Sequence, residues 1–282
     1  MLSLDQIDVH TGGGKIGTFE VPCPICGPEK SAAGQKRKVL RIWRNTTAFA
    51  TYRCARCDVQ GYSRADGARP DPVELEKARA EARLFAAATA EDKRKKARWL
   101  WARRCPAGGT IAEVYLRNVR CYDGPLPPSI GFLPSRGDFP PSMISAFAFP
   151  DEEGISEIQA VHLTRLKTDG LGKAATSADK IMIGTPRGVP IALAPINDGL
   201  GLAVTEGIEN GLSIHAATGL GVWSAGSASF LPALGAAVPR YVDEVSIVAD
   251  PDQAGRRFAD DLAAVLRDRR IAHRILVWGA VA

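Results

Sequence analysis

The 282-residue sequence has no apolar run that approaches the ~18 residues of a membrane-spanning helix. Its first fifteen residues lack the basic and then apolar layout of a secretory signal peptide. We therefore expect a soluble, cytoplasmic protein without membrane contact. The phosphate-loop pattern GxxxxGK followed by Ser or Thr does not occur either, so the sequence carries no P-loop motor of its own.

Cysteine is scarce, and four of the six residues fall into two closely spaced pairs. The stretches CPIC and CARC contain Cys23, Cys26, Cys54 and Cys57, with 27 residues between the pairs. Each CxxC places two thiolates on one tight turn, and two such turns complete a four-sulfur site suited to Zn²⁺. Because the intervening stretches KVLRIW and TAFATYR have strand character, we predict a zinc ribbon within residues 1–66.

Two other uses of these cysteines stay open. A pair of disulfides would suit a secreted module, although nothing in the sequence signals secretion. A redox-active CxxC is the second alternative, although such a motif is not expected twice in one module. Structural zinc is favoured because it supplies folding energy to a segment with little apolar content. We expect Cys105 and Cys121 to be free thiols.

Positive charge is concentrated in the first part of the chain. Residues 1–120 hold 23 Lys and Arg against 13 Asp and Glu, whereas residues 121–282 hold 13 against 18. A basic segment suggests a polyanionic partner, although solubility alone would also explain it. Aromatic residues lie between the basic ones and either stack on bases or form the ribbon core. We predict that single-stranded nucleic acid contacts four arginines of the ribbon: Arg41, Arg44, Arg53 and Arg56.

Residues 67–104 are predicted to form a helical linker. The prolines of ARPDP interrupt the chain, and good helix formers follow from residue 73. We expect two helices with a break near Thr89, because TAED resembles a capping box. Trp99 and Trp101 are interpreted as packing anchors rather than platforms for base stacking.

The remaining sequence predicts a mixed α/β (α+β) architecture. A mixed segment over residues 105–198 includes a hairpin in MISAFAFPDEEGISEIQAVHLTRL. Residues 199–282 alternate short apolar runs with helical stretches, a rhythm typical of a parallel sheet that is covered on both faces.

Three acidic residues stand directly after two strands of this predicted sheet. Glu206 follows LAVT, and Asp250 and Asp252 follow VSIVA. Because ligands collect at the carboxyl ends of parallel strands, neighbouring strands would bring the three carboxylates together. Such acids repel one another unless a cation such as Mg²⁺ or Mn²⁺ neutralises them. The alternative is structural, in which Glu206 caps a helix and the aspartates form a turn and a cap.

At TEGIENGLS and ADPDQAG the sequence resembles the Toprim domain shared by bacterial-type primases, topoisomerases and some nucleases. With the upstream four-cysteine ribbon, the resemblance narrows to DNA primases of the bacterial and phage type. The stretches YLRNVRCYDGPLPPSIGFLP and IQAVHLTRLKTDGLGKAATSADKIMIG resemble the corresponding segments of phage- and plasmid-borne primases. The resemblance covers most of residues 20–280 and is strongest at 202–256.

This resemblance implies roles for individual residues. Glu206, Asp250 and Asp252 would be the catalytic acids that hold Mg²⁺ or Mn²⁺, with Glu209 as a further acid. Arg117 would contact template or nucleotide. Four residues of the basic stretch would face the nucleotide phosphates, unless they belong to a solvated hairpin loop: Arg165, Lys167, Lys173 and Lys180.

The implied function is template-directed synthesis of RNA primers on single-stranded DNA from nucleoside triphosphates, alongside a separate helicase. A Toprim nuclease would use the same acids and metal, with water attacking a phosphodiester. A non-catalytic adaptor that binds nucleic acid is the third hypothesis. Topoisomerase activity is not expected, because none of the five tyrosines stands in an evident nucleophile context.

Overall fold

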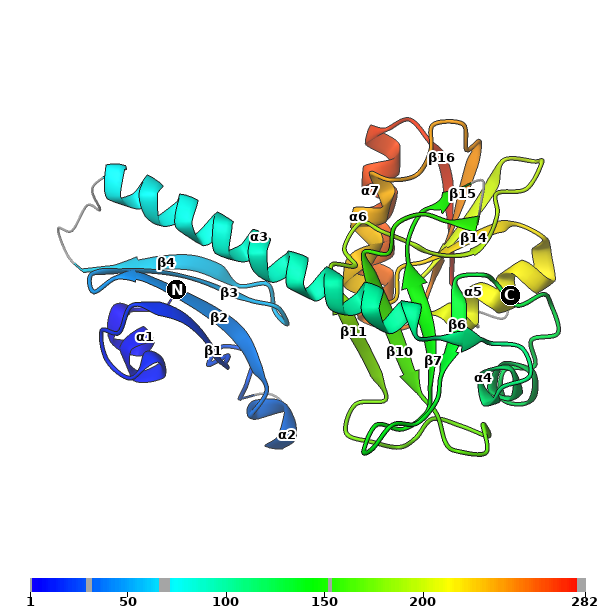
Figure 1. The fold of residues 1–282 in the computed structure, drawn as a ribbon. Helices are drawn as coiled ribbons and strands as arrows, with labels where there is room; N and C mark the ends of the chain where they lie inside the picture. Colours follow the sequence, from blue (N-terminus) through cyan, green and yellow to red (C-terminus); the bar gives the residue numbers. More distant parts are fainter. Residues whose placement is uncertain (1, 29–31, 66–71, 152–153, 278–282) are drawn as a thin grey trace. The chain divides into compact units, whose positions relative to one another are not determined.

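A computed structural model describes residues 2–28, 32–65, 72–151 and 154–277 (Figure 1). The chain divides into two compact units, Met1–Ala87 and Ala88–Ala282. Helix α3, Pro72–Ala102, contributes residues to both. No helix in the described ranges has the length and apolar character needed to cross a membrane.

The N-terminal unit is built on one antiparallel sheet of order β1-β2-β3-β4. Helix α1 begins at a capping box, in which the Ser3 hydroxyl accepts from the Gln6 N–H and the Gln6 side chain accepts from the Ser3 N–H. The elements are α1 Leu4–Thr11, β1 Gly17–Pro22, α2 Ala32–Gln35, β2 Lys38–Thr46, β3 Phe49–Cys54 and β4 Gln60–Arg64.

One face of this sheet carries the core of the ribbon. Leu40 and Ile42 of β2 and Tyr52 of β3 are buried there with Ile7 of α1. The Tyr52 hydroxyl accepts a hydrogen bond from the Leu2 N–H at 2.8 Å. Tyr52 is therefore a core residue, which leaves it unavailable for stacking on a base.

Helix α3 corrects one expectation from the sequence. It runs without interruption through Thr89, so the predicted break into two helices was wrong. No Gly or Pro occurs between residues 73 and 102, and a capping-box sequence can continue as helix where good helix formers flank it. Glu91 supports this turn by pairing with Arg94 at 2.8 Å, one helical turn further on.

The two tryptophans of α3 differ in their surroundings. Trp101 is buried and packs with Ala97 against Ile144 and Val161, as expected of a packing anchor. Trp99 is 45% exposed, and the guanidinium of Arg103 lies 3.8 Å from its ring centre.

The second unit contains a middle antiparallel sheet of order β11-β10-β7-β6-β5. The predicted hairpin appears as the pairing of β7 with β10, and a short β8–β9 ladder lies between them in the sequence. A short helix α4 continues as a π-helical turn over Tyr115–Val119. The elements are β5 Cys105–Pro106, α4 Ile111–Val114, β6 Ile130–Leu133, β7 Ser142–Phe147, β8 Pro150–Asp151, β9 Gly154–Ile155, β10 Ala160–Arg165 and β11 Lys180–Gly184.

The C-terminal sheet has the order β12-β14-β13-β15-β16. Four of its strands are parallel, and β12 is an antiparallel edge strand paired with β14. The sheet is therefore mixed and mostly parallel. Its elements are β12 Ile191–Ala194, β13 Gly201–Thr205, α5 Ile208–Thr218, β14 Gly221–Ser224, η2 Ala228–Phe230, α6 Leu231–Gly235, β15 Glu244–Ala249, α7 Gln253–Asp268 and β16 Ala272–Val277.

Both faces of this sheet are covered, as its apolar strands predict. Leu202 and Val204 of β13 belong to the cluster that includes residues of α6 and α7. Ala203, between them, belongs to the opposite cluster with Ile208 and Leu212 of α5. Burial on both faces fixes the register of β13, and with it the edge where the next residues emerge.

Candidate zinc centre and candidate active site

The four cysteines of the two CxxC pairs come together in the N-terminal unit. Cys23 Sγ lies 4.0 Å from Cys57 Sγ, and Cys26 Sγ lies 3.8 Å from Cys54 Sγ. All four sulfurs lie within 4.8 Å of one another. A tetrahedron with Zn–S bonds of ~2.3 Å has sulfur–sulfur edges of about 3.8 Å, so the arrangement suits a structural Zn²⁺.

The same distances exclude the disulfide alternative for these pairs. A disulfide needs a sulfur–sulfur distance of about 2.05 Å, and all four cysteines are free thiols. Burial, followed by hydrogen bonds with the other three cysteines, raises the pKa of Cys26 to about 12. Cys23, Cys26 and Cys54 are buried and Cys57 is exposed. Ionisation of such close thiols needs a neighbouring cation, and a bound zinc ion would supply it.

The predicted acidic residues emerge at one edge of the C-terminal sheet. Strands β13 and β15 are adjacent and parallel, with Thr205 opposite Val248, so Glu206 and Asp250 leave the sheet at the same end. Burial, and then the carboxylates of Asp250 and Asp252, raise the pKa of Glu206. The three acids are thus close enough to repel one another.

These acids do not form a closed ligand shell. In the described part of the chain, the four cysteines are the only group of three or more His, Cys, Asp or Glu ligand atoms gathered within reach of one ion. An open set of carboxylates suits Mg²⁺, which keeps several waters and binds through one or two carboxylates and substrate phosphates.

Asp252 has a structural role as well. It is the N-cap of α7, and its Oδ1 accepts a hydrogen bond from the Gly255 N–H at 2.7 Å. A Cβ on Gly255 would lie 2.6 Å from the carbonyl oxygen of Asp250, so the tight turn requires glycine there. Asn210 of α5 donates from Nδ2 to Asp250 Oδ1 at 2.9 Å.

Next to the acids lies a group of basic residues around one buried carboxylate. Glu209 is 8% exposed, and its Oε1 accepts a hydrogen bond from the Tyr115 hydroxyl at 3.1 Å. Three cations surround it: Arg120 at 3.5 Å and Lys173 at 3.9 Å from Oε1, and Lys180 at 3.7 Å from Oε2. Burial, and then the charge of Lys180, lower the pKa of Lys173.

Acids and cations share one cavity of about 240 Å³. Glu206 and Asp250 line it together with Arg120, Lys180 and Glu209. A cavity that offers carboxylates to a metal ion and cations to an anion suits a complex of a divalent metal with a phosphate ester.

Two family models match the chain. Residues 201–280 match the Toprim domain, and residues 91–193 match a domain of unknown function, DUF7146. Strands β13 to β16 and the helices between them lie in the stretch that matches the Toprim domain, and β12 lies before it. The resemblance carried by TEGIENGLS and ADPDQAG is thereby confirmed, and Toprim domains typically use divalent metals.

Three solved primase structures match this chain at low identity. The primase fragment of the Bacteriophage T7 primase-helicase protein is 12% identical, with a TM-score of 0.40 over 92% of this chain and 89% of that one. The Aquifex aeolicus primase (zinc-binding and RNA polymerase domains) is 13% identical, with a TM-score of 0.42 over 98% and 79%. A DNA primase domain from Pseudomonas aeruginosa is 12% identical, with a TM-score of 0.36 over 52% and 48%. No curated protein matches.

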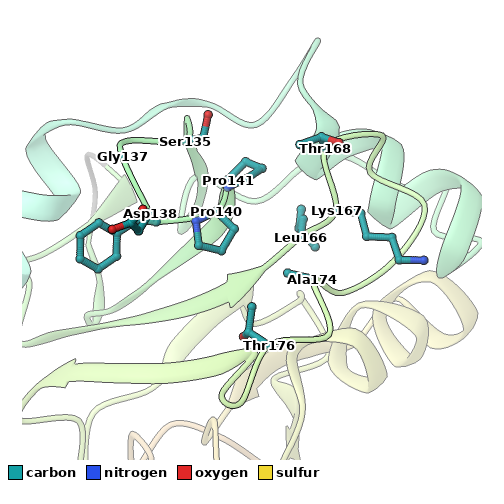
Figure 2. Close-up of a pocket in the computed structure, with 11 residues that line it drawn as sticks. Ser135, Gly137, Asp138, Pro140, Pro141, Leu166, Lys167, Thr168, Ala174 and Thr176 are labelled. Atoms are coloured by element: carbon teal, nitrogen blue, oxygen red, sulfur yellow. The ribbon is translucent and has the colours of Figure 1, made fainter.

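Of the four predicted phosphate-binding residues, only Lys180 lines this cavity of about 240 Å³, the Toprim cavity, and Lys173 reaches its edge by pairing with Glu209. Lys167 lines a second cavity of about 360 Å³, with Pro140, Pro141 and Thr176 around it (Figure 2). Arg165 donates to the Thr176 hydroxyl at 3.4 Å. Of the predicted basic stretch, the structure brings Lys173 and Lys180 to the acids and leaves Arg165 and Lys167 beside this other cavity.

Arg117 is held by its own segment. It pairs with Glu113 at 3.3 Å and donates to the carbonyl oxygens of Tyr122 at 2.8 Å and Gly124 at 2.6 Å. These bonds brace the turn that follows the π-helical residues. The neighbouring Arg120 lines the Toprim cavity in its place.

Three of the four ribbon arginines reach the surface, and one does not. Arg41 pairs with Glu20, Arg53 pairs with Asp58 at 2.8 Å, and Arg56 donates to the Gly34 carbonyl at 2.9 Å. The buried Arg44 side chain is only 2% exposed and pairs with Asp8 at 2.6 Å. Arg44 is therefore not available to nucleic acid at this surface.

The alternation of strand residues explains the burial of Arg44. Residues 40, 42 and 44 of β2 point to the same face of the sheet, and Leu40 and Ile42 are in the core. The burial of Arg44 could therefore have been predicted from the two-residue period in KVLRIWR.

Two further site residues were not predicted from the sequence. Asn210 could have been identified, because it stands in the first turn of the helix that follows Glu206. Nothing in the sequence distinguished Arg120 from Arg117.

Proposed function

We propose that the protein is a DNA primase that makes RNA primers on single-stranded DNA from nucleoside triphosphates. The observation that carries the proposal is the Toprim cavity, in which Glu206 and Asp250 share the lining with Lys180 and Arg120. The four-cysteine centre supports it, because a nuclease does not need a ribbon to scan a template.

In this mechanism Glu206, Asp250 and Asp252 hold Mg²⁺ or Mn²⁺. When bound, the metal neutralises charge on the triphosphate and on the transition state. Lys180 and Arg120 bind phosphate oxygens, which orients the α-phosphate toward the 3′-hydroxyl of the growing primer. The hydroxyl oxygen forms a bond to the α-phosphorus, pyrophosphate leaves, and the hydroxyl proton passes to solvent.

Arginines of the ribbon supply template contacts in the proposal. Arg41, Arg53 and Arg56 are exposed or half-buried and are placed on or beside strands β2 and β3. Such contacts with phosphate groups are independent of sequence and weaken as salt rises. The loss of one of these arginines should therefore weaken template binding more at low salt than at high salt, because the contact contributes less as salt rises.

Primer synthesis on single-stranded DNA with Mg²⁺ or Mn²⁺ tests the proposal. Wild type should make primers, and Asp250→Asn should lower the rate by about a hundredfold or more, because a metal-binding charge is lost. Asp261→Asn is the matched control, since Asp261 is an exposed acid on α7 that does not line the cavity. DNA cleavage that Asp250→Asn abolishes would favour a Toprim nuclease. Binding without either activity would favour an adaptor.

A further inference from the structure

Glu209 is engaged through both of its carboxylate oxygens. Oε1 is approached by Tyr115, Arg120 and Lys173, and Oε2 by Lys180. Burial opposes ionisation, but the charges of Lys180, Lys173 and Arg120 outweigh it and lower the pKa of Glu209. Glu209 is therefore an anion at neutral pH, surrounded by cations.

The balance of charge around Glu209 leaves positive charge for a ligand. One carboxylate faces three cations, Arg120, Lys173 and Lys180. His162 lies buried beside this group, and burial followed by Lys180 lowers its pKa to about 4, so it adds no charge at neutral pH. Without the central anion, the three cations would repel one another and turn toward solvent.

The occupied oxygens also argue against a metal at Glu209. Each oxygen of the Glu209 carboxylate has a cationic partner, and these cations would repel a divalent ion placed beside it. Glu206 differs, because burial and then the carboxylates of Asp250 and Asp252 raise its pKa despite the opposing charge of Lys180. Glu209 thus belongs to the cationic side of the cavity and not to the set of metal-binding acids.

We propose that Glu209 is a positioning residue that holds Lys173, Lys180 and Arg120 together as a preformed receptor for the β- and γ-phosphates of the nucleotide. The inference rests on the proposed function, since it concerns the same cavity. It also gives a reason for substrate choice: three converging cations select a triphosphate over a monophosphate by the number of phosphate charges they meet.

The variant Glu209→Gln tests this role, because glutamine keeps the shape and an acceptor for Tyr115 but removes the charge. We expect the Kd for a non-hydrolysable nucleoside triphosphate and the KM for nucleotide to rise about tenfold, with kcat changed less than about threefold. The preference for triphosphate over monophosphate should fall, and the Mg²⁺ concentration for half-maximal rate should not change. Glu91→Gln is the matched control, since Glu91 also pairs with two arginines, Arg94 and Arg98, but does not line the cavity.

A second measurement does not depend on catalysis. Acetylation of Lys173 and Lys180 by acetic anhydride, followed by mass spectrometry without nucleotide, should be faster in Glu209→Gln than in wild type. Thermal unfolding of both variants checks that the fold is kept.

The outcomes separate the inference from the proposed function. Unchanged or tighter triphosphate binding in Glu209→Gln would overturn the inference, because Glu209 would then be only a competing anion. A raised Mg²⁺ requirement with unchanged KM would make it a metal ligand instead. Equal acetylation rates would also overturn it. A wild-type protein that binds triphosphate but makes no primers would refute the primase proposal and leave the binding and acetylation results to decide on Glu209.

Discussion

Asn210 donates a hydrogen bond from its Nδ2 to Oδ1 of Asp250 at 2.9 Å. The bond links the first turn of α5 to the turn that follows β15, two elements that are 40 residues apart in sequence. Because the amide is neutral, it orients the carboxylate without cancelling its charge. The carboxylate of Asp250 is thus oriented by a residue of the neighbouring helix α5, whereas the carboxylate of Asp252 is oriented by α7, the helix that it caps.

Asn210→Ala should release Asp250 and slow primer synthesis by about tenfold, because loss of the oriented geometry lowers transition-state stabilisation. Asn210→Asp should slow it more, since a second carboxylate would replace the donor beside Asp250. Steady-state rates at saturating Mg²⁺ check both. Equal activity of wild type and Asn210→Ala, at equal thermal stability, would show that the bond has no positioning role.

The two roles of Asp252 can be separated by two substitutions. Asn is as good an N-cap as Asp, so Asp252→Asn should keep the stability of α7 while lowering activity through the lost charge. Asp252→Ala should lower activity and also cost about 1 kcal/mol in unfolding free energy. Urea denaturation together with primer synthesis measures both effects. Full activity in Asp252→Asn would contradict metal binding by this residue.

Removal of zinc should unfold the N-terminal unit, because its small core depends on the four-sulfur site. Cys57→Ser or a strong chelator should release about one zinc per chain and abolish template binding by the ribbon. Circular dichroism and metal analysis of the full chain measure this. Cys105→Ser is the control, since Cys105 lies outside the four-cysteine group. A full-length protein that contains no zinc and keeps its ribbon would refute the assignment.

The buried His162 predicts a pH dependence of stability. Burial and the charge of Lys180, opposed by Glu209, lower its pKa to about 4 from the usual 6.5. Between these values the unfolded chain binds the proton and the native state does not, so acid favours unfolding. The unfolding free energy should fall as pH drops from about 6.5 to about 4, by up to ~1.4 kcal/mol per pH unit.

His162→Gln should flatten that slope, because its side chain does not titrate. Urea denaturation at several pH values compares the two proteins, and other titrating groups cancel in the difference between them. Identical slopes for wild type and His162→Gln would mean that another group is responsible. The charges facing His162 are those of Lys180, Glu209 and Lys173.

Much of the site could be predicted because its signals are local. Paired CxxC stretches limit the chemistry of Cys23 and its partners to a few options. Acids at strand ends are recognisable because a buried strand has an apolar run and a definite last residue, as at Glu206 and Asp250. The continuous helix α3 was missed for the same reason, since a local capping signal at Thr89 was outweighed by the helix formers on both sides.

The sequence by itself determined the thiolate set, the strand–helix rhythm of the Toprim domain and the residue types at its strand ends. Tertiary structure alone decided which basic residues meet the acids: Lys173 and Lys180 converge on Glu209, Arg120 enters where Arg117 was expected, and Lys167 lines another cavity. Strand order also had to come from the fold, because only the adjacency of β13 and β15 brings Glu206 to Asp250. The physical reason is that the residue type fixes the charge of each side chain. The distances between these charges and their burial, which give them a function, depend on packing between elements that are far apart in the sequence.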